Sequence, residues 1–141
     1  MALTNEEINS FLSERRNAVL GTVRKDGSPQ LNPMWFDWTG EVFYISTTRA
    51  RFKYNSIKRD PRVSVVVDDV LDHHSVIAKG KATIQEDNIW DMTRKLVYKY
   101  YGQEEGDPYL EQLQKQKRVL IVFKPRKMQS WGPVPREAAK P

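Results

Sequence analysis

Hydrophobic residues alternate with polar ones along much of the chain, in short runs that turn residues separate. These runs predict six strands, at residues 18–24, 29–38, 41–46, 62–68, 73–85 and 119–128. Asp26-Gly27 falls between the first two runs and Thr39-Gly40 between the next two. Because an Asp-Gly pair is a strong hairpin signal, we expect the first three strands to form a meander.

Two segments repeat their apolar residues at helical spacing. Thr4 and Glu7 form a capping-box pattern at the start of a predicted helix over 5–15. The apolar residues of 87–101 recur every three or four positions, which predicts an amphipathic helix. Further predictions are a loop at 102–108, a short helix at 108–116 and an irregular tail after Trp131.

Six short antiparallel strands with a few covering helices predict a mainly β (α+β) domain, a closed or split β-barrel. Gly80 predicts a bend in the fifth strand. The length of 141 residues suits a single domain over 1–141.

Composition removes several classes of function. The chain has no cysteine, which excludes disulfides, thiolate metal sites and cysteine nucleophiles. It has no apolar run long enough to cross a membrane, and its first residues are acidic and polar, unlike a signal peptide. A cytoplasmic protein without membrane contact is the expectation. The net charge of +5 favours anionic partners but is too modest to indicate nucleic acid.

The junction at 46–53 is a candidate phosphate site. An apolar strand ends there in the hydroxyls of Ser46 and Thr47, and a predicted helix start follows with Arg51 and Lys53. Free backbone N–H groups, the helix dipole and full positive charges all favour an anion at such a place. A merely solvated cationic helix is the alternative interpretation.

The strand over 30–38 is a second candidate, for a flat ligand. Asn32 and Met34 share one face of it, beside two tryptophans. Pro33 removes one hydrogen bond of the sheet and leaves room for a ligand against the backbone. Such groups suit a planar heteroaromatic ring, although an ordinary aromatic core gives the same pattern.

Other candidate sites are weaker. Asp68, Asp69, Asp72 and the pair His73-His74 contain metal-ligating groups, but their spacing matches no metal signature, so we interpret them as a polar loop without metal. No serine elbow supports a Ser-His-Asp hydrolase. With no acid–base or nucleophilic set, the catalytic residues stay unassigned, and a cofactor would carry the chemistry of any enzyme here.

Several of these motifs together resemble a known family. Gln30-Leu-Asn-Pro-Met-Trp-Phe, Phe43-Tyr-Ile-Ser-Thr, Arg51 with Lys53, and Asp60-Pro-Arg-Val-Ser resemble the pyridoxamine 5′-phosphate oxidase-like split-barrel flavoproteins. The closest resemblance is to their deazaflavin-using branch, which binds coenzyme F420. It covers most of residues 5–131.

The resemblance implies a homodimer with the cofactor at the interface between subunits. It implies that Ser46, Thr47, Arg51 and Lys53 hold the cofactor phosphate and that Asn32, Pro33 and Met34 line the ring. Ser75, in a segment that reaches the cofactor from the other subunit, and Trp131 would complete the site.

The expected function is therefore an oxidoreductase that transfers hydride from reduced F420 to a conjugated small-molecule electron acceptor. Flavin-type oxidases of the family carry an arginine-led second strand and a contiguous Arg-Lys pair, whereas Phe52 separates Arg51 from Lys53 here. An FMN-dependent oxidase or reductase is the alternative enzyme. A cofactor carrier or a nucleic-acid-binding barrel is the alternative outside enzymes, but the aromatic and cationic residues are not interleaved as nucleic-acid binding requires.

Overall fold

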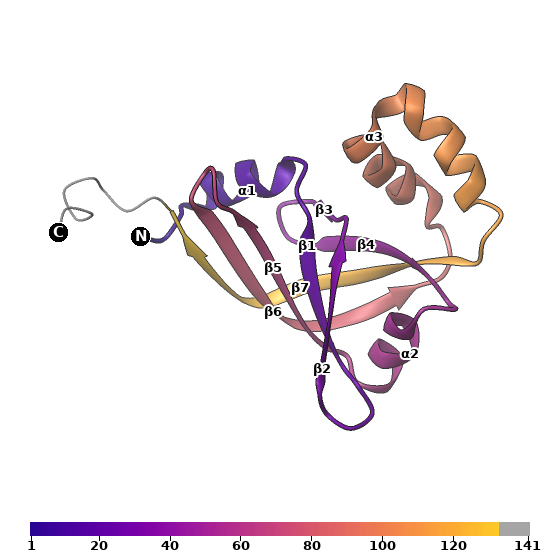
Figure 1. Ribbon diagram of the computed structural model, residues 1–141, viewed down its shortest axis with the longest axis horizontal. Helices are drawn as coiled ribbons and strands as arrows, with labels where there is room; N and C mark the ends of the chain where they lie inside the picture. Colours follow the sequence, from indigo (N-terminus) through magenta and orange to yellow (C-terminus); the bar gives the residue numbers. More distant parts are fainter. Residues whose placement is uncertain (133–141) are drawn as a thin grey trace.

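The computed structural model describes residues 1–132, which contain three helices and seven strands, arranged as in Figure 1. The helices are α1 (Asn5–Ser13), α2 (Phe52–Arg59) and α3 (Trp90–Leu113). The strands are β1 (Ala18–Val23), β2 (Pro29–Met34), β3 (Asp37–Trp38), β4 (Phe43–Thr48), β5 (Arg62–Asp69), β6 (His74–Gln85) and β7 (Arg118–Trp131). The predicted irregular tail lies outside the described residues, apart from Gly132.

All seven strands belong to one sheet, in the order β2-β1-β5-β6-β7-β4-β3, and every pair is antiparallel. The sheet curls around its apolar side, and the strands at its two edges, β2 and β3, do not pair with each other. This split β-barrel confirms the predicted fold class. The strand count is seven instead of six because the predicted strand over 29–38 divides into β2 and β3.

Side chains from α3 stabilise the break between β2 and β3. The Phe36 N–H donates to Tyr100 Oη at 3.1 Å, and Lys99 Nζ donates to the carbonyls of Phe36 and Leu12, both at 3.0 Å. Tyr100 in turn donates its hydroxyl to the Arg16 carbonyl at 2.7 Å. Backbone groups that would otherwise pair in a continuous strand are thus satisfied by a helix, a contact that the strand's own sequence does not reveal.

The core follows the predicted alternation. Every second residue of β1, β4 and β5 is buried inside the curl, together with Phe36, Phe123 and the apolar face of α1. Gly80 produces the predicted bend in β6, where the register against β7 shifts. A Cβ at position 80 would stand 3.0 Å from Phe123 Cε2 and 3.1 Å from the Arg126 nitrogen, so only glycine lets the two strands approach this closely.

The prediction of a loop at 102–108 is wrong. Apart from a kink at Gly102, where φ is 75°, the segment is helical and continues α3 to Leu113. The two halves of the helix fold back on each other, because Gly106 allows the closest approach to Tyr98 and Tyr98 donates a hydrogen bond to Asp107. Val97, Leu110 and Leu113 form a small core of their own between the halves.

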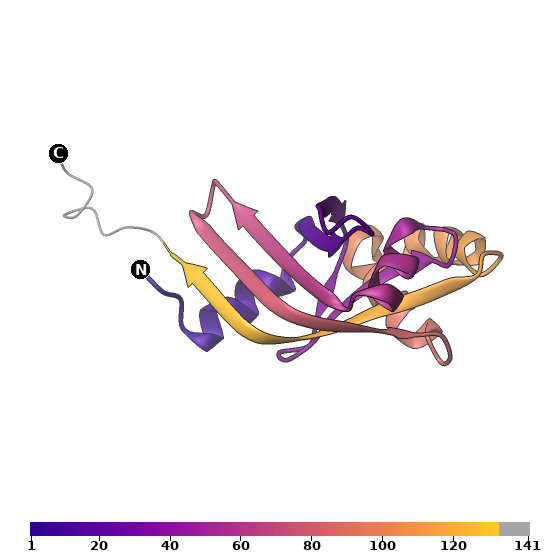
Figure 2. The ribbon, with the colours of Figure 1, turned by 90° about the horizontal axis from the view of Figure 1, so that it is seen from below.

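The two ends of the curled sheet carry different features, as Figures 1 and 2 both show. Helices α2 and α3 lie toward one end. The N-terminus and the end of β7 lie at the other, tied by a hydrogen bond from Gly132 N to the Met1 carbonyl at 2.6 Å. In residues 1–132, no helix is both long and apolar enough to cross a membrane.

The break between β2 and β3 predicts an unusual dependence of stability on pH. Burial lowers the pKa of Lys99 to about 8, from 10.5 for a free lysine. Between about pH 8 and pH 10 the unfolded chain therefore binds more protons at this residue than the folded protein, and the free energy of unfolding rises with pH. Burial also raises the pKa of Tyr100 to about 12, which reverses the trend above this range.

Arginine at position 99 keeps a hydrogen-bond donor but stays charged over this pH range. In Lys99→Arg, the free energy of unfolding should therefore not rise between about pH 8 and pH 10. Urea unfolding of both proteins across the range measures the difference between them. If the free energy of unfolding depends on pH in the same way in both proteins, the pKa of Lys99 is not lowered in the folded protein.

Candidate functional site

The junction between β4 and α2 has the features of an anion site. Strand β4 ends at Thr48, and α2 begins at Phe52 with Arg51 as its N-cap. Arg51 makes no capping hydrogen bond with its side chain, and the first turn contains no acidic residue. The first backbone N–H groups of the helix consequently lack the side-chain acceptor that commonly satisfies them, which is the arrangement that binds phosphates.

The cations at this junction are of two kinds. Arg49 forms an ion pair with Glu86 at 3.4 Å, so its charge is compensated. Arg51 and Lys53 form no ion pair within residues 1–132. Lys53 is half-buried, and its pKa is lowered first by this burial and then by the charge of Arg51. An anion would relieve both effects.

Arg118 is a third cation of the site, and the sequence analysis missed it. It opens β7 opposite Thr48 and donates to Ser46 Oγ through Nη2 at 2.8 Å and through Nε at 3.3 Å. Burial lowers the pKa of Arg118, and Arg51 lowers it further, with no carboxylate paired to it in the described chain. The Lys117-Arg118 pair before an apolar run hinted at it, but only the β4–β7 pairing brings it to Ser46.

The predicted hydroxyl residues therefore differ in position. Ser46 directs its hydroxyl at Arg118. Thr47 is only 3% exposed and faces the core, so its backbone is the part available to a ligand. The Ser46 hydroxyl therefore lies beside the Arg118 guanidinium, whereas the Thr47 side chain packs in the core beneath the junction.

The residues predicted to line a ring lie on both sides of β2. Asn32 and Met34 are half-buried and share the side that carries Leu20 and Ala18 in the neighbouring strand, whereas Pro33 is exposed on the other side. The Asn32 side chain accepts a long hydrogen bond of 3.5 Å from Gln30 Nε2. Of the three residues predicted to line the ring, only Asn32 and Met34 therefore lie on the same side of the strand.

Ser75 and Trp131 are neighbours, but they lie far from the cations. They stand opposite each other where β6 begins and β7 ends, and Trp131 is 44% exposed. The helix that carries Lys53 is tied to the other end of β6, by a hydrogen bond of 2.6 Å between Tyr54 and Glu86. At about 3.3 Å per residue, the strand separates the two ends by up to about 33 Å. One protomer alone does not bring all the predicted site residues together.

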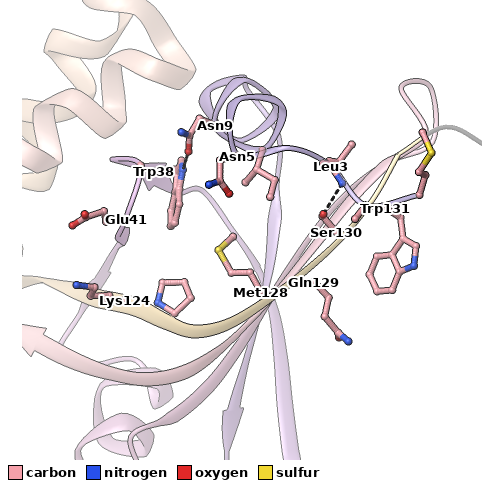
Figure 3. Close-up of a pocket in the computed structure, with 15 residues that line it drawn as sticks. Leu3, Asn5, Asn9, Trp38, Glu41, Lys124, Met128, Gln129, Ser130 and Trp131 are labelled. Atoms are coloured by element: carbon pink, nitrogen blue, oxygen red, sulfur yellow. Dashed lines mark hydrogen bonds between the residues drawn. The ribbon is translucent and has the colours of Figure 1, made fainter.

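A cleft of about 950 Å³ lies toward the end of the sheet that carries Trp131, between α1, β3 and β7 (Figure 3). Trp38 and Met128 point toward its hollow, and Trp131 lies on the other side of β7. Some of its polar groups are engaged: Trp38 Nε1 donates to Asn9 Oδ1 at 2.8 Å, and Leu3 N donates to Ser130 Oγ at 2.9 Å. Among residues 1–132, Lys124 is the only cationic side chain in its lining, and Glu41 also lines it, so the cleft lacks the charge of the β4–α2 junction.

The acidic loop near β6 has a structural role. Arg16 donates to Asp69 at 2.7 Å and also pairs with Asp72 and Glu14. The hydrogen bond from Arg16, followed by one from the Asp72 backbone N–H, lowers the pKa of Asp69. The Arg16 contacts tie the β5–β6 turn to the segment before β1. The two aspartates are thus engaged as the predicted polar loop requires.

Comparison with known proteins identifies the family of this chain. The model of the pyridoxamine 5′-phosphate oxidase family matches residues 4–132. The chain belongs to this family.

Solved structures agree with this membership. An F420 reductase is 31% identical to the chain, covering 85% of it and 94% of that protein, with a TM-score of 0.69. A conserved hypothetical protein of Mycobacterium tuberculosis is 27% identical, covering 94% and 86%, with a TM-score of 0.78. A FAD-binding protein of Mesorhizobium loti, 19% identical over 92% and 93% with a TM-score of 0.68, shares the fold.

The cation cluster predicts that a simple anion stabilises the protein. Inorganic phosphate at about ten times its Kd would contribute about 1.4 kcal/mol, which raises Tm by about 4 °C for a chain of this size. Thermal unfolding in phosphate and in chloride at equal ionic strength measures the effect.

Lys53→Ala should lose most of this shift, whereas Lys79→Ala, at an exposed position of β6, should keep it. Equal shifts in both variants would place the anion elsewhere.

Proposed function

We propose that this member of the pyridoxamine 5′-phosphate oxidase family is an oxidoreductase that uses reduced coenzyme F420 to deliver hydride to a conjugated small molecule. The observation that carries the proposal is the set of cations at the β4–α2 junction. Lys53 and Arg118 are half-buried beside Arg51 and have no carboxylate partner in the described chain. Charges held in this way are suited to a bound phosphate.

The chain's own residues would bind and orient the cofactor. Arg51, Lys53 and the free N–H groups of α2 hold the phosphate, and Arg118 keeps Ser46 directed toward it. Asn32 and Met34, with the Pro33 backbone beside them, offer a flat polar and sulfur-containing surface to the ring. The cofactor supplies the hydride, and the protein contributes orientation and exclusion of water.

F420 is favoured over FMN by charge. The junction carries more positive charge than one phosphate needs, since Arg118 adds to Arg51 and Lys53. A cofactor with an acidic tail would use this excess, whereas FMN ends at its phosphate. The F420 reductase at 31% identity supports the same choice. The family's name and its FAD-binding structural neighbour favour the second candidate, an FMN-dependent oxidase or reductase.

A homodimer would complete the site. Ser75 and Trp131 stand at the end of the sheet remote from Lys53, and the exposed apolar side chains of Val70 and Leu71 lie at that same end. A second copy that presents its Ser75–Trp131 end to the β4–α2 junction of the first joins the two halves. Two equivalent sites result, as two-fold symmetry requires.

The choice of cofactor predicts a difference in affinity and in its response to salt. F420 should bind more tightly than FMN, and its affinity should fall more steeply as salt is added, since exposed charges are screened over about 8–10 Å at physiological ionic strength. Fluorescence titrations at two salt concentrations measure both.

In the same titrations, Arg51→Ala and Lys53→Ala should each weaken F420 binding by about tenfold or more, because a hydrogen bond to a charged group contributes about 1.5–3 kcal/mol. Tighter binding of FMN, or an equal effect of salt on both, would assign the chain to the flavin-dependent members instead.

The dimer predicts complementation between two defective proteins. Lys53→Ala and Trp131→Ala each damage both sites of their own homodimer. A mixed dimer holds one site with both changes and one with neither, so mixing should restore tight binding to a fraction of the sites. Refolding the two variants together, followed by cofactor titration and light scattering, tests this.

Affinity that stays low after mixing, while each variant still dimerises, would show that Lys53 and Trp131 do not serve one site from two protomers. A monomer that binds cofactor tightly would reject the interface.

A further inference from the structure

A second cleft lies between the β1–β2 hairpin and the exposed side of α2. Its volume is about 590 Å³. Residues from both elements line it, among them Arg24, Lys25, Gln30, Phe52, Asn55 and Arg59. Lys53, Arg51 and Asn32 are not part of this lining, so the cleft is adjacent to the proposed cofactor site without coinciding with it.

The cleft is positively charged. Arg24, Lys25 and Arg59 line it, and no carboxylate of residues 1–132 does. Asp26 and Asp60 are nearest in sequence: Asp26 accepts from Ser28 N at 3.0 Å, and Asp60 accepts from Arg62 Nη2 at 2.7 Å. After the hydrogen bonds from Ser28 and Arg62, Arg24 and Arg59 also contribute to the lowered pKa of Asp26 and Asp60, respectively, but neither aspartate forms an ion pair with a cation of the cleft in the described chain. The cations of the cleft are therefore left to attract an anion from solution.

One of these cations has a fixed position. Arg59 donates through Nη2 to the Val23 carbonyl at 3.0 Å, which joins the end of α2 to the end of β1. A guanidinium has five N–H donors in a rigid fork, and this contact uses one of them. Arg59 can thus hold the two sides of the cleft together and still bind a carboxylate.

The cleft also offers an apolar surface. Phe52 is the first residue of α2 and is 84% exposed, although it stands between Arg51 and Lys53 in the sequence. The amides of Gln30 and Asn55 lie around it. An exposed phenyl ring beside three cations matches a ligand with a flat apolar body and an acidic end.

A buried polar group underlies the same region. Thr22 is opposite Gln30 in the sheet and shares its side of the strands. Its hydroxyl is buried and has no hydrogen-bond partner in the described chain. Gln30 in turn donates to Asn32, at 3.5 Å, so the side chains of β2 run from the cleft to the surface proposed for the ring.

We propose that this cleft binds the electron acceptor and that the acceptor is an aromatic or conjugated carboxylate. Its body lies on Phe52, and its acidic group is held by Arg24, Lys25 and Arg59. This inference rests on the proposed function, because it assigns the substrate class of that oxidoreductase. The cleft also explains why Phe52 interrupts the cation pair: the ring faces the acceptor while Lys53 faces the phosphate.

Binding of a redox-inert probe tests the proposal apart from catalysis. The probe is 2-naphthoate, and 2-naphthamide is its neutral counterpart. Calorimetry on the protein with and without bound F420 should give naphthoate at least tenfold tighter binding than the amide. Lys25→Gln, at an exposed turn position whose side chain forms no hydrogen bond or ion pair within residues 1–132, should weaken naphthoate several-fold and leave the amide and F420 unchanged.

Further variants separate charge from shape. Phe52→Ala should weaken both probes, and Arg59→Gln should weaken naphthoate alone. Arg126→Gln, an exposed arginine of β7 outside the cleft, is the matched control and should change neither.

Equal affinities for the two probes, or no effect of Lys25→Gln, would overturn the inference while F420 binding leaves the proposed function standing. Displacement of naphthoate by a γ-glutamyl trimer would assign the cleft to the acidic tail of the cofactor and reject the acceptor. If naphthoate binds but neither F420 nor FMN does, the proposed function fails, and the acceptor role fails with it.

Discussion

Two half-buried cations, Lys53 and Arg118, have no carboxylate partner within residues 1–132, and the proposed site depends on them. Burial lowers the pKa of both residues, because moving a charge from water into a protein is costly unless an opposite charge accompanies it. The charge of Arg51 lowers the pKa of both further, although Tyr109 offsets part of this at Arg118. The surrounding structure holds them there by the register of β4 on β7 and by the hydrogen bonds from Arg118 to Ser46. Such an arrangement stores unfavourable electrostatic energy that a phosphate would release.

If the junction holds the cofactor as proposed, the architecture of the barrel would call for a second subunit. The strands β5, β6 and β7 are long, so the end that carries Ser75 and Trp131 lies well away from the end that carries the cations (Figure 2). A cofactor bound at the junction would be covered on one side only. The exposed side chains of Val70 and Leu71 at the remote end supply apolar surface that a partner would bury.

Much of the fold follows from the sequence because alternation and turn chemistry are local. The hairpin at Asp26-Gly27, the capping box of α1 and the bend at Gly80 are each determined by a few neighbouring residues. The errors arise where distant contacts decide. Lys99 and Tyr100 divide the second strand from 60 residues away along the chain, and the packing of Gly106 on Tyr98 makes a helix of a segment that resembles a loop.

The candidate site was predictable to the same extent. Arg51 and Lys53 belong to one short motif, so local sequence is enough to propose them as ligands of an anion. Arg118 belongs to a strand that only folding brings beside Ser46, and the cleft around Phe52 needs the β1–β2 hairpin and α2 to be placed together. The central claim is that the β4–α2 junction binds the phosphate of a flavin-type cofactor. A crystal structure with F420 tests it most directly. We expect the phosphate to lie between Arg51 and Lys53, with Trp131 of a second copy of the chain at the ring. A phosphate bound in the cleft between α1, β3 and β7 would contradict this claim.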